Sequence, residues 1–272
     1  MSDGWGGLPE NSVRFRQTDR REQTTLEYAG VSDVGRVRRH NEDAFAFASV
    51  GANVPFAVVC DGMGGHLAGE VASQMAIDVL LEEMNALKKI HLGKLRTVVA
   101  SANQRIFRHA ISHEACKGMG TTLVLAVFDE EDVFVLNVGD SRAYHYDQRG
   151  RRIAQISRDH SLLEELISTK QLSGDQIKNF PYRNVITRSL GARQVVKPDV
   201  FECRWQSGDC ILLCSDGMSD CIQEEEILAV LHRERENMLD VCNELVDMAN
   251  ERGGKDNITV VVVQNAGEGD GR

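Results

Sequence analysis

Short segments rich in β-branched and aromatic residues occur in groups along this chain, and longer amphipathic segments lie between the groups. The short segments are bounded by turn residues and predict strands at 25–31, 43–50, 55–60, 121–128, 132–138, 142–146, 152–156, 200–205, 210–214 and 258–263. Apolar residues at helical spacing predict helices at 70–87, 94–114, 224–231 and 238–249. A doubly wound parallel sheet would require strands and helices to alternate singly. The grouping therefore predicts an α+β fold with two antiparallel sheets flanked by helices.

The chain has the size and composition of one globular domain with polar ends. Its 272 residues are 42% hydrophobic and 26% charged, and these values exclude wholesale disorder. Residues 1–24 are polar, rich in glycine and dotted with arginine, so we expect a flexible N-terminal tail. We expect a single domain over 25–265 and a short C-terminal tail over 266–272, because no linker or repeat interrupts the pattern.

The charge balance and the cysteines exclude several functional classes. Forty-one acidic residues against 31 basic ones give a formal net charge of −10, which disfavours binding to nucleic acid or to an anionic membrane surface. The sequence has no apolar run long enough to span a bilayer and no secretory signal at its start. Seven cysteines without a C-x-x-C pair indicate reduced, buried thiols. We therefore expect a cytoplasmic monomer.

Four aspartates lie at the ends of strongly apolar predicted strands. Asp61 directly follows one strand, Asp140 and Asp216 each follow another across one residue, and Asp256 shortly precedes the last strand. Taken singly, an aspartate beside a glycine is a common turn signal. Neighbouring strand ends in an antiparallel sheet could, however, bring all four carboxylates to one edge, where their repulsion would require cations. Oxygen ligands without a His or Cys pattern favour Mg²⁺ or Mn²⁺.

An arginine-rich segment precedes the second predicted strand. Arg36, Arg38 and Arg39 come just before the acidic pair Glu42 and Asp43. One interpretation is a basic turn that the following acids neutralise. The other places an arginine beside a carboxylate–metal cluster, where its planar fork and the metal could together hold a phosphate ester.

Eight motifs, in this order, resemble those of the bacterial branch of the PPM (type 2C) metal-dependent protein phosphatases. They are S-D-V-G-R-V-R-R-H-N-E-D-A (32–44), V-V-C-D-G-M-G-G-H-L-A-G-E (58–70), G-M-G-T-T-L (118–123), N-V-G-D-S-R-A-Y (137–144), D-H-S-L (159–162), N-V-I-T-R-S-L-G (184–191), L-L-C-S-D-G-M-S-D (212–220) and G-G-K-D-N-I-T-V (253–260). The resemblance implies an α-β-β-α sandwich with a dinuclear Mn²⁺ or Mg²⁺ centre at one edge. It also implies hydrolysis of phosphoserine and phosphothreonine in proteins.

The resemblance assigns ligand roles to individual residues. Asp61 matches the aspartate that bridges the two ions, and the Gly62 carbonyl matches a ligand of the second ion. Asp216 and Asp256 match the remaining ligands of the first ion. Glu42 matches an acid near the second ion that often acts through water.

Further roles follow from the same resemblance. Asp43 matches an aspartate that orients the site, and Asp140 matches the ligand of a third, weaker ion, with Asp216 helping. Arg38 matches the arginine that binds the substrate phosphate. Residues 161–182 correspond to a mobile flap beside the cleft.

Two departures from the family pattern affect the expected chemistry. Animal-type members carry a histidine, proposed as general acid, where this chain has Met63, as bacterial relatives do. The proton donor is therefore unassigned; water on a third ion is one candidate, and His66 is another, although His66 more simply braces its loop. In addition, the end of the flap has F-P-Y-R-N where many bacterial relatives have H-P before x-R-N, so contacts between flap and substrate can differ.

The expected mechanism uses a hydroxide held between two divalent cations, which attacks phosphorus in line with the leaving serine or threonine oxygen. Arg38 and the cations would neutralise charge on the phosphoryl oxygens. Other catalytic classes lack their motifs: no cysteine has an arginine six residues later, no P-loop occurs, and the glycine fingerprint that starts at Gly62 is incomplete. His109 and His113 lack the glutamate of a zinc protease motif and are expected to face solvent.

Two alternative functions remain at the level of sequence. One is a catalytically weak pseudophosphatase that binds phosphoproteins; the complete set of aspartates and Arg38 argues against it. The other is a two-metal nuclease, which the acidic charge disfavours. The expected partners are a phosphoprotein substrate and a cognate Ser/Thr kinase whose action the enzyme reverses.

Overall fold

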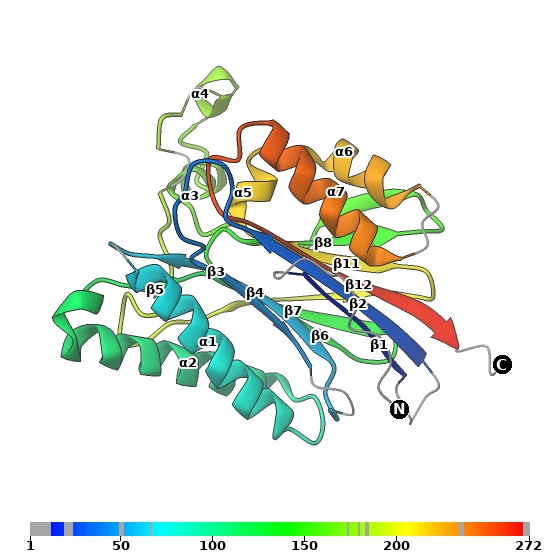
Figure 1. Ribbon diagram of the computed structural model, residues 1–272, viewed down its shortest axis with the longest axis horizontal. Coiled ribbons are helices and arrows are strands. Elements are labelled where there is room, and N and C mark those ends of the chain that lie inside the picture. The colour runs from blue at the N-terminus through cyan, green and yellow to red at the C-terminus, as the bar shows by residue number, and fades with distance from the viewer. Residues whose placement is uncertain are drawn as a thin grey trace.

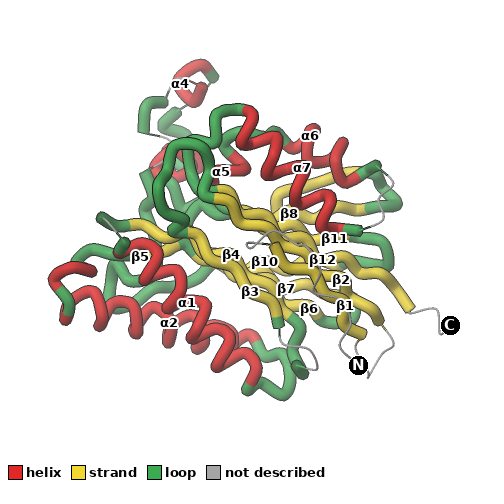
Figure 2. The backbone as a smooth tube through the Cα atoms, in the orientation of Figure 1, coloured by secondary structure: helices red, strands yellow, loops and turns green. Residues whose placement is uncertain are grey.

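Two stacked β-sheets form the centre of the molecule, and helices cover both outer faces (Figure 1; Figure 2). The computed structural model describes residues 12–18, 24–48, 52–65, 67–172, 174–178, 180–182, 185–233 and 237–268. All strand pairs in the two described sheets are antiparallel. The predicted α+β sandwich is confirmed. None of the described helices combines the length and apolar character that crossing a bilayer requires.

The first sheet carries the two ends of the described chain. Its strands are, in spatial order, β1 (Ser12–Thr18), β2 (Thr24–Asp33), β12 (Ile258–Glu268), β11 (Cys210–Cys214), β8 (Arg142–Asp147) and β9 (Arg152–Gln155). Helices α6 (Glu224–Leu231) and α7 (Met238–Glu251) pack on its outer face (Figure 1).

The second sheet lies beneath the first and is covered by the two longest described helices. Its strands are, in spatial order, β10 (Asp199–Arg204), β7 (Asp132–Val138), β6 (Leu123–Phe128), β4 (Phe56–Met63) and β3 (Asp43–Phe47), with the short β5 (Gly120–Thr121) paired to the end of β4. Helices α1 (Ala68–Asn85) and α2 (Leu92–Ser112) cover its outer face, and the short η1 (Glu114–Cys116) follows α2.

Strand β12 shows why the central strands are continuous apolar runs. Val260 and Val262 belong to the apolar cluster under α7, whereas Val261 and Val263 belong to the cluster between the two sheets. Successive side chains point to opposite faces of a strand. Because both faces of this strand are covered, the run V-V-V-V buries every side chain.

The structure differs from the prediction at both ends of the domain. Ser12–Thr18 lie within the predicted flexible tail 1–24, yet they form β1 and pair with β2. The segment S-V-R-F-R-Q-T alternates apolar and polar residues, which is the period of a strand, and β2 would otherwise be an open sheet edge. Strand β12 continues to Glu268, past the predicted boundary at 265, because its pairing with β2 resumes after a register shift. The rest of both predicted tails (1–11, 19–23 and 269–272) lies outside the described residues.

Candidate active site

Three strand ends and one strand start meet at one edge of the sandwich. Asp61 lies inside β4, two residues before its end, whereas the sequence predicted it directly after the strand; Asp140 follows β7 across Gly139. Asp216 follows β11 and begins the short helix α5 (Asp216–Ser219), and Asp256 precedes β12. Strands β4 and β7 belong to one sheet, and β11 and β12 to the other. The aspartates therefore come together where the two sheets meet, and we call this place the carboxylate edge.

The electrostatics show that these carboxylates lie close to one another. Burial raises the pKa of Asp61 well above its usual range, and the carboxylates of Asp43, Asp216, Asp140 and Asp256 raise it further, in that order. Burial also raises the pKa of Asp216, with Asp140 as the first neighbouring carboxylate to add to the effect. Such a group of acids favours protonation or a bound cation.

Asp43 links the two sheets at this edge. It is the cross-strand partner of Asp61 in the β3–β4 pair. Its Oδ2 atom accepts hydrogen bonds from the hydroxyls of Ser215 and Thr259, on the other sheet, each at 2.7 Å. Burial raises the pKa of Asp43 to about 6, although these two hydrogen bonds act to lower it. Asp43 is thus held in one orientation by its neighbours.

Glu42 and Gly62 form a tight backbone arrangement beside the start of α1. The Gly62 N–H donates to the Glu42 carbonyl at 3.1 Å. A Cβ at position 62 would lie 2.2 Å from the Gly69 carbonyl oxygen, so only glycine fits there. The Glu42 carboxylate lies against Gly69, in the first turn of α1, where the helix dipole favours a negative charge. Burial raises the pKa of Glu42, while Arg38 lowers it.

Arg38 reaches the carboxylate edge through an ion pair. Its Nη2 atom donates to Asp256 Oδ2 at 2.8 Å, and half of its side chain stays exposed. The guanidinium therefore lies beside a candidate ligand with donors still open to solvent. An arginine in this position can bind a phosphate oxygen next to a metal.

Asp140 and Asp216 line a small cavity of about 130 Å³ together with Ser219 and Asp220. Asp140 is 7% exposed, and burial raises its pKa to about 6, with Asp159 adding to the effect. Nearby, Arg142 forms a two-pronged ion pair with Asp159, through contacts of 2.7 to 3.1 Å. The ion pair between Arg142 and Asp159 neutralises both of these charges. Asp140, in contrast, has no cationic side chain paired with it among the described residues.

Two residues that hold the site were not singled out in the sequence. Asn257 accepts a hydrogen bond from the Glu42 N–H at 2.8 Å and donates to the carbonyls of Val34 and His40 at 3.0 and 2.9 Å. The His160 ring accepts from the Gly139 N–H through Nδ1 at 3.0 Å, and the His160 backbone N–H donates to the Gly139 carbonyl at 2.9 Å. Both residues occur in the quoted motifs, but only their tertiary contacts reveal what they do.

The segment predicted as a flap carries two short helices, α3 (Leu162–Ser168) and α4 (Asp175–Lys178). Figure 1 shows α4 projecting from the body of the molecule at the carboxylate edge. Ser161 caps α3, and it also pairs with Ile186 in an isolated bridge that closes the base of the segment. His66, and the last two residues of the F-P-Y-R-N segment, lie outside the described residues. His109 and His113 stack on each other at an exposed end of α2, apart from the site.

The donor set suits a hard divalent cation. Three buried carboxylate oxygens, Oδ1 of Asp43, Asp140 and Asp216, have no hydrogen-bond partner, and such orphaned atoms carry a free-energy cost. Across the described residues, no three His, Cys, Asp or Glu side chains are grouped closely enough to enclose an ion. To enclose an ion, the carboxylates would therefore have to rotate, for example by release of Asp256 from Arg38, and their hard oxygens suit Mg²⁺ or Mn²⁺.

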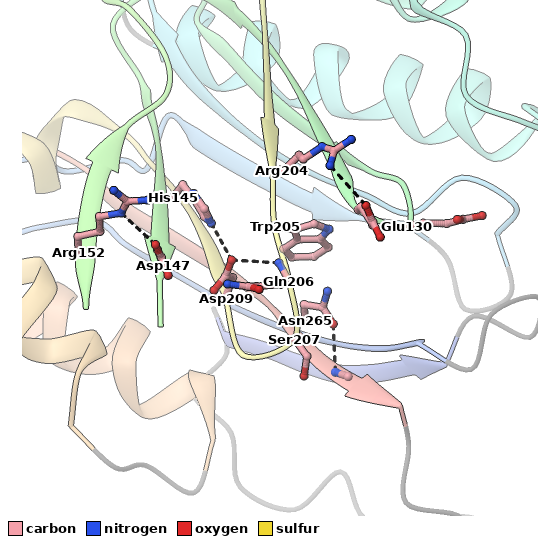
Figure 3. Close-up of a pocket in the computed structure, with 12 residues that line it drawn as sticks. Glu130, His145, Asp147, Arg152, Arg204, Trp205, Gln206, Ser207, Asp209 and Asn265 are labelled. Carbon is pink, nitrogen blue, oxygen red and sulfur yellow. Dashed lines mark hydrogen bonds and ion pairs between the residues drawn. The ribbon is translucent and has the colours of Figure 1, made fainter. Parts of the chain in front are cut away.

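A second, larger hollow of about 580 Å³ lies at the far end of the sandwich (Figure 3). There His145 donates to the buried Asp209 at 3.1 Å, and Trp205 forms part of the wall (Figure 3). The cavity is at the opposite ends of the strands that carry Asp140 and Asp216. It contains none of the predicted site residues, so the carboxylate edge is the candidate active site.

Comparison with known proteins gives consistent similarities over most of the chain. Residues 35–258 match the family model "Protein phosphatase 2C". The chain is 37% identical over 238 residues to the serine/threonine phosphatase stp of Listeria monocytogenes, covering 86% of this chain and 93% of that protein. It is 35% identical to protein phosphatase PhpP of Streptococcus pneumoniae, covering 88% of this chain and 97% of that protein.

Solved structures show the same similarity. A serine/threonine phosphatase of S. agalactiae superposes with a TM-score of 0.82 at 31% identity, covering 88% of this chain and 99% of that one. The catalytic domain of the phosphatase PstP, solved in complex with two manganese ions, superposes with a TM-score of 0.76 at 33% identity, covering 88% of this chain and 97% of that one.

Proposed function

This chain belongs to the protein phosphatase 2C family, and on that premise we propose how its carboxylate edge performs the reaction. The protein is a serine/threonine protein phosphatase that depends on divalent metal and acts on phosphoproteins. We propose that Asp61 would serve as a ligand to both of two ions. Asp216 and Asp256 would complete the protein ligands of the first ion, and the Gly62 carbonyl would contribute to the second, with Glu42 acting through water.

The observation that carries this assignment is the group of buried, mutually repelling carboxylates. Asp61 and Asp43 face each other across a strand pair, and three oxygens of the group lack a hydrogen bond. If no cation were bound there, replacing these buried acids with apolar residues would stabilise the folded protein. The bound cations would supply Lewis acidity and an activated water at neutral pH.

The chain's own residues orient the substrate. Arg38 presents unused guanidinium N–H groups beside Asp256, and we propose that they bind the phosphoryl oxygens and stabilise charge in the transition state. Asp43, held by Ser215 and Thr259, keeps Asp61 oriented from the neighbouring strand. Asp140 and Asp216 would hold a third, weaker ion in the small cavity that they line.

The test is hydrolysis of p-nitrophenyl phosphate and of a phosphothreonine peptide by the purified chain with Mn²⁺, with Mg²⁺ and with EDTA. We expect turnover with either metal and none with EDTA. Titration calorimetry with Mn²⁺ gives a readout that is independent of activity: we expect two binding events and a third, weakest one, which is lost in Asp140→Asn. Turnover that persists in EDTA would overturn the assignment.

We further propose that the enzyme acts as a monomer and reverses a cognate Ser/Thr kinase. The exposed large apolar side chains of the described structure are few, at Val37, Leu67, Ile111, Tyr182, Val185 and Val195. A few exposed apolar side chains are normal on the surface of a monomer. Sedimentation analysis tests the monomer. Loss of phosphate from the autophosphorylated kinase, with Asp61→Asn as the inactive control, tests the pairing.

A further inference from the structure

A loop of five exposed residues, 36–40, lies beside the carboxylate edge and carries three arginines. We call it the arginine loop. It connects β2 to β3 and runs next to the loop between α7 and β12 that holds Asp256; Figure 1 shows the two loops side by side. Only Arg38 of its three arginines has a place in the reaction proposed above.

The backbone of the arginine loop is firmly anchored. The N–H groups of Arg36 and Val37 both donate to the Gly254 carbonyl, at 2.7 and 3.2 Å. The Asn257 side chain donates to the carbonyl of His40 at the other end of the loop at 2.9 Å. A Cβ on Gly254 would lie 2.8 Å from the Arg36 nitrogen, so the two loops are in close contact. The arginines therefore project from a fixed base, which reduces the entropy lost when they bind a ligand.

Two of the three guanidinium groups pair with no carboxylate of the described residues. Arg38 pairs with Asp256, whereas Arg36 and Arg39 form no ion pair with any residue in the part of the chain that the structure describes. This is notable in a protein with ten more acidic than basic residues. Free cations beside the phosphate-binding position create a local field that attracts anions, although the protein as a whole repels them.

We propose that Arg36 and Arg39 bind anionic groups that flank the phosphorylated residue, so that the enzyme prefers acidic or multiply phosphorylated segments. This inference rests on the proposed role of Arg38. Consecutive Cα atoms are about 3.8 Å apart, so both arginines begin within two residues of Arg38. An extended substrate rises about 3.3 Å per residue. The flanking anions would therefore lie within a few residues of the phosphorylated serine or threonine.

The shared chemistry is a carboxylate or a second phosphoryl group, and peptides separate the two. The test compares kcat/KM with Mn²⁺ for three phosphothreonine peptides of equal length, with flanking alanines, with flanking aspartates, or with a second phosphothreonine nearby. We expect the wild type to favour both anionic peptides over the alanine peptide. Preference for the diphosphorylated peptide alone would assign the loop to phosphate, and preference for both would assign it to anions generally.

The variants are Arg36→Gln, Arg39→Gln and the double variant. The free energy of an exposed ion pair corresponds to a roughly 1.5- to 5-fold higher kcat/KM per arginine for an anionic peptide. The ratio of kcat/KM between anionic and alanine peptides should therefore fall most of the way to one in the double variant. The ratio in the wild type should also fall as ionic strength rises to about 1 M, where the Debye length is about 3 Å. The matched control is Arg149→Gln with Arg151→Gln, two exposed arginines in the turn between β8 and β9 at the far end of the sandwich. This control variant should keep the wild-type ratio of kcat/KM between anionic and alanine peptides.

The result that overturns the inference is an equal ratio in the wild type, the double variant and the control. Failure of the proposed function looks different, because no peptide would then be hydrolysed with Mn²⁺. Melting temperatures show whether each variant is still folded, and the ratio is measured within each folded variant, so a general loss of turnover does not affect it.

Discussion

Asp43 and Asp61 are direct cross-strand partners in the β3–β4 pair. Directly opposed side chains on one face of a sheet have Cβ atoms about 4.5–5.5 Å apart, and like charges in such a pair are destabilising. Two hydroxyls from the other sheet bind one oxygen of Asp43, and its second oxygen has no partner. The fold thus keeps a repulsive pair at the place where a cation would relieve the repulsion.

The first prediction concerns Asp61. Asp61→Asn should lose far more than tenfold in turnover at saturating Mn²⁺, because tenfold is only about 1.4 kcal/mol and an amide is a poor substitute for a bridging carboxylate. The metal-free variant should melt at a higher temperature than the metal-free wild type, since the opposed charges are removed. Asp78→Asn, on the exposed face of α1, should change neither quantity. Retention of a tenth or more of wild-type turnover by Asp61→Asn would sink the assignment.

The second prediction concerns pH and Asp140. The pKa of Asp140 is raised from the ordinary 3.8 to about 6, so the folded, metal-free state holds this proton more tightly than the unfolded state does. The stability that comes from this group is full below about pH 4 and is lost as the pH rises through 6. Asp140→Asn should therefore stabilise the metal-free protein by up to about 3 kcal/mol at pH 7.

Urea unfolding of both proteins in EDTA between pH 4 and pH 8 measures this difference. The advantage of Asp140→Asn should shrink toward zero at the acidic end of the range. An advantage that is independent of pH would mean that the charge of Asp140 is not its cause.

The third prediction concerns Arg38. Arg38→Ala should lower kcat/KM on a phosphopeptide by roughly 10- to 150-fold, because a charge-assisted hydrogen bond is worth about 1.5–3 kcal/mol. Since Arg38 also pairs with Asp256, Mn²⁺ affinity should be kept or rise when that competitor is removed. Lysine should restore activity only in part, because it offers a point charge instead of a fork. Wild-type kcat/KM in Arg38→Ala would make Arg38 a structural residue.

The fourth prediction concerns Asn257, which is 5% exposed. Asn257→Ala leaves the Glu42 N–H and the carbonyls of Val34 and His40 without their partners. We expect a loss of about 2–4 kcal/mol in unfolding free energy, from the unmet hydrogen bonds, together with weaker Mn²⁺ binding by calorimetry. Asn257→Asp keeps the acceptor for Glu42 and should retain more metal affinity than the alanine variant. Equal Mn²⁺ affinity in the alanine and aspartate variants would show that the Asn257 hydrogen bonds do not support metal binding.

The fifth prediction concerns β1. Deletion of residues 1–18 uncovers the edge of β2, so the melting temperature should fall, by roughly 2–4 °C for each 1 kcal/mol lost. Turnover of p-nitrophenyl phosphate at 20 °C should be unchanged, because β2 and β12 still separate the new edge from Asp216. An unchanged melting temperature would show that the β1–β2 pairing contributes nothing to stability.

The sequence by itself determined the layers of the fold and the chemistry of the edge. Periodicity separates strands from helices over most of the domain, because a strand repeats every two residues and a helix every 3.6. The apolar run before Asp61 and the one before Asp216 predict strands that end in carboxylates, and carboxylates without His or Cys predict a hard cation. These are local properties, which a chain displays before it folds.

Only the tertiary structure decided which partners meet. Arg38 contacts Asp256 across 218 residues of chain, and Thr259 contacts Asp43 across 216. Such contacts arise because two sheets must bury their apolar faces against each other, and the register of that packing is set by all the strands together. The same cause explains β1: its seven residues form a strand because β2 offers an edge to pair with. Which distant segment a strand pairs with cannot be read from the local sequence of that strand.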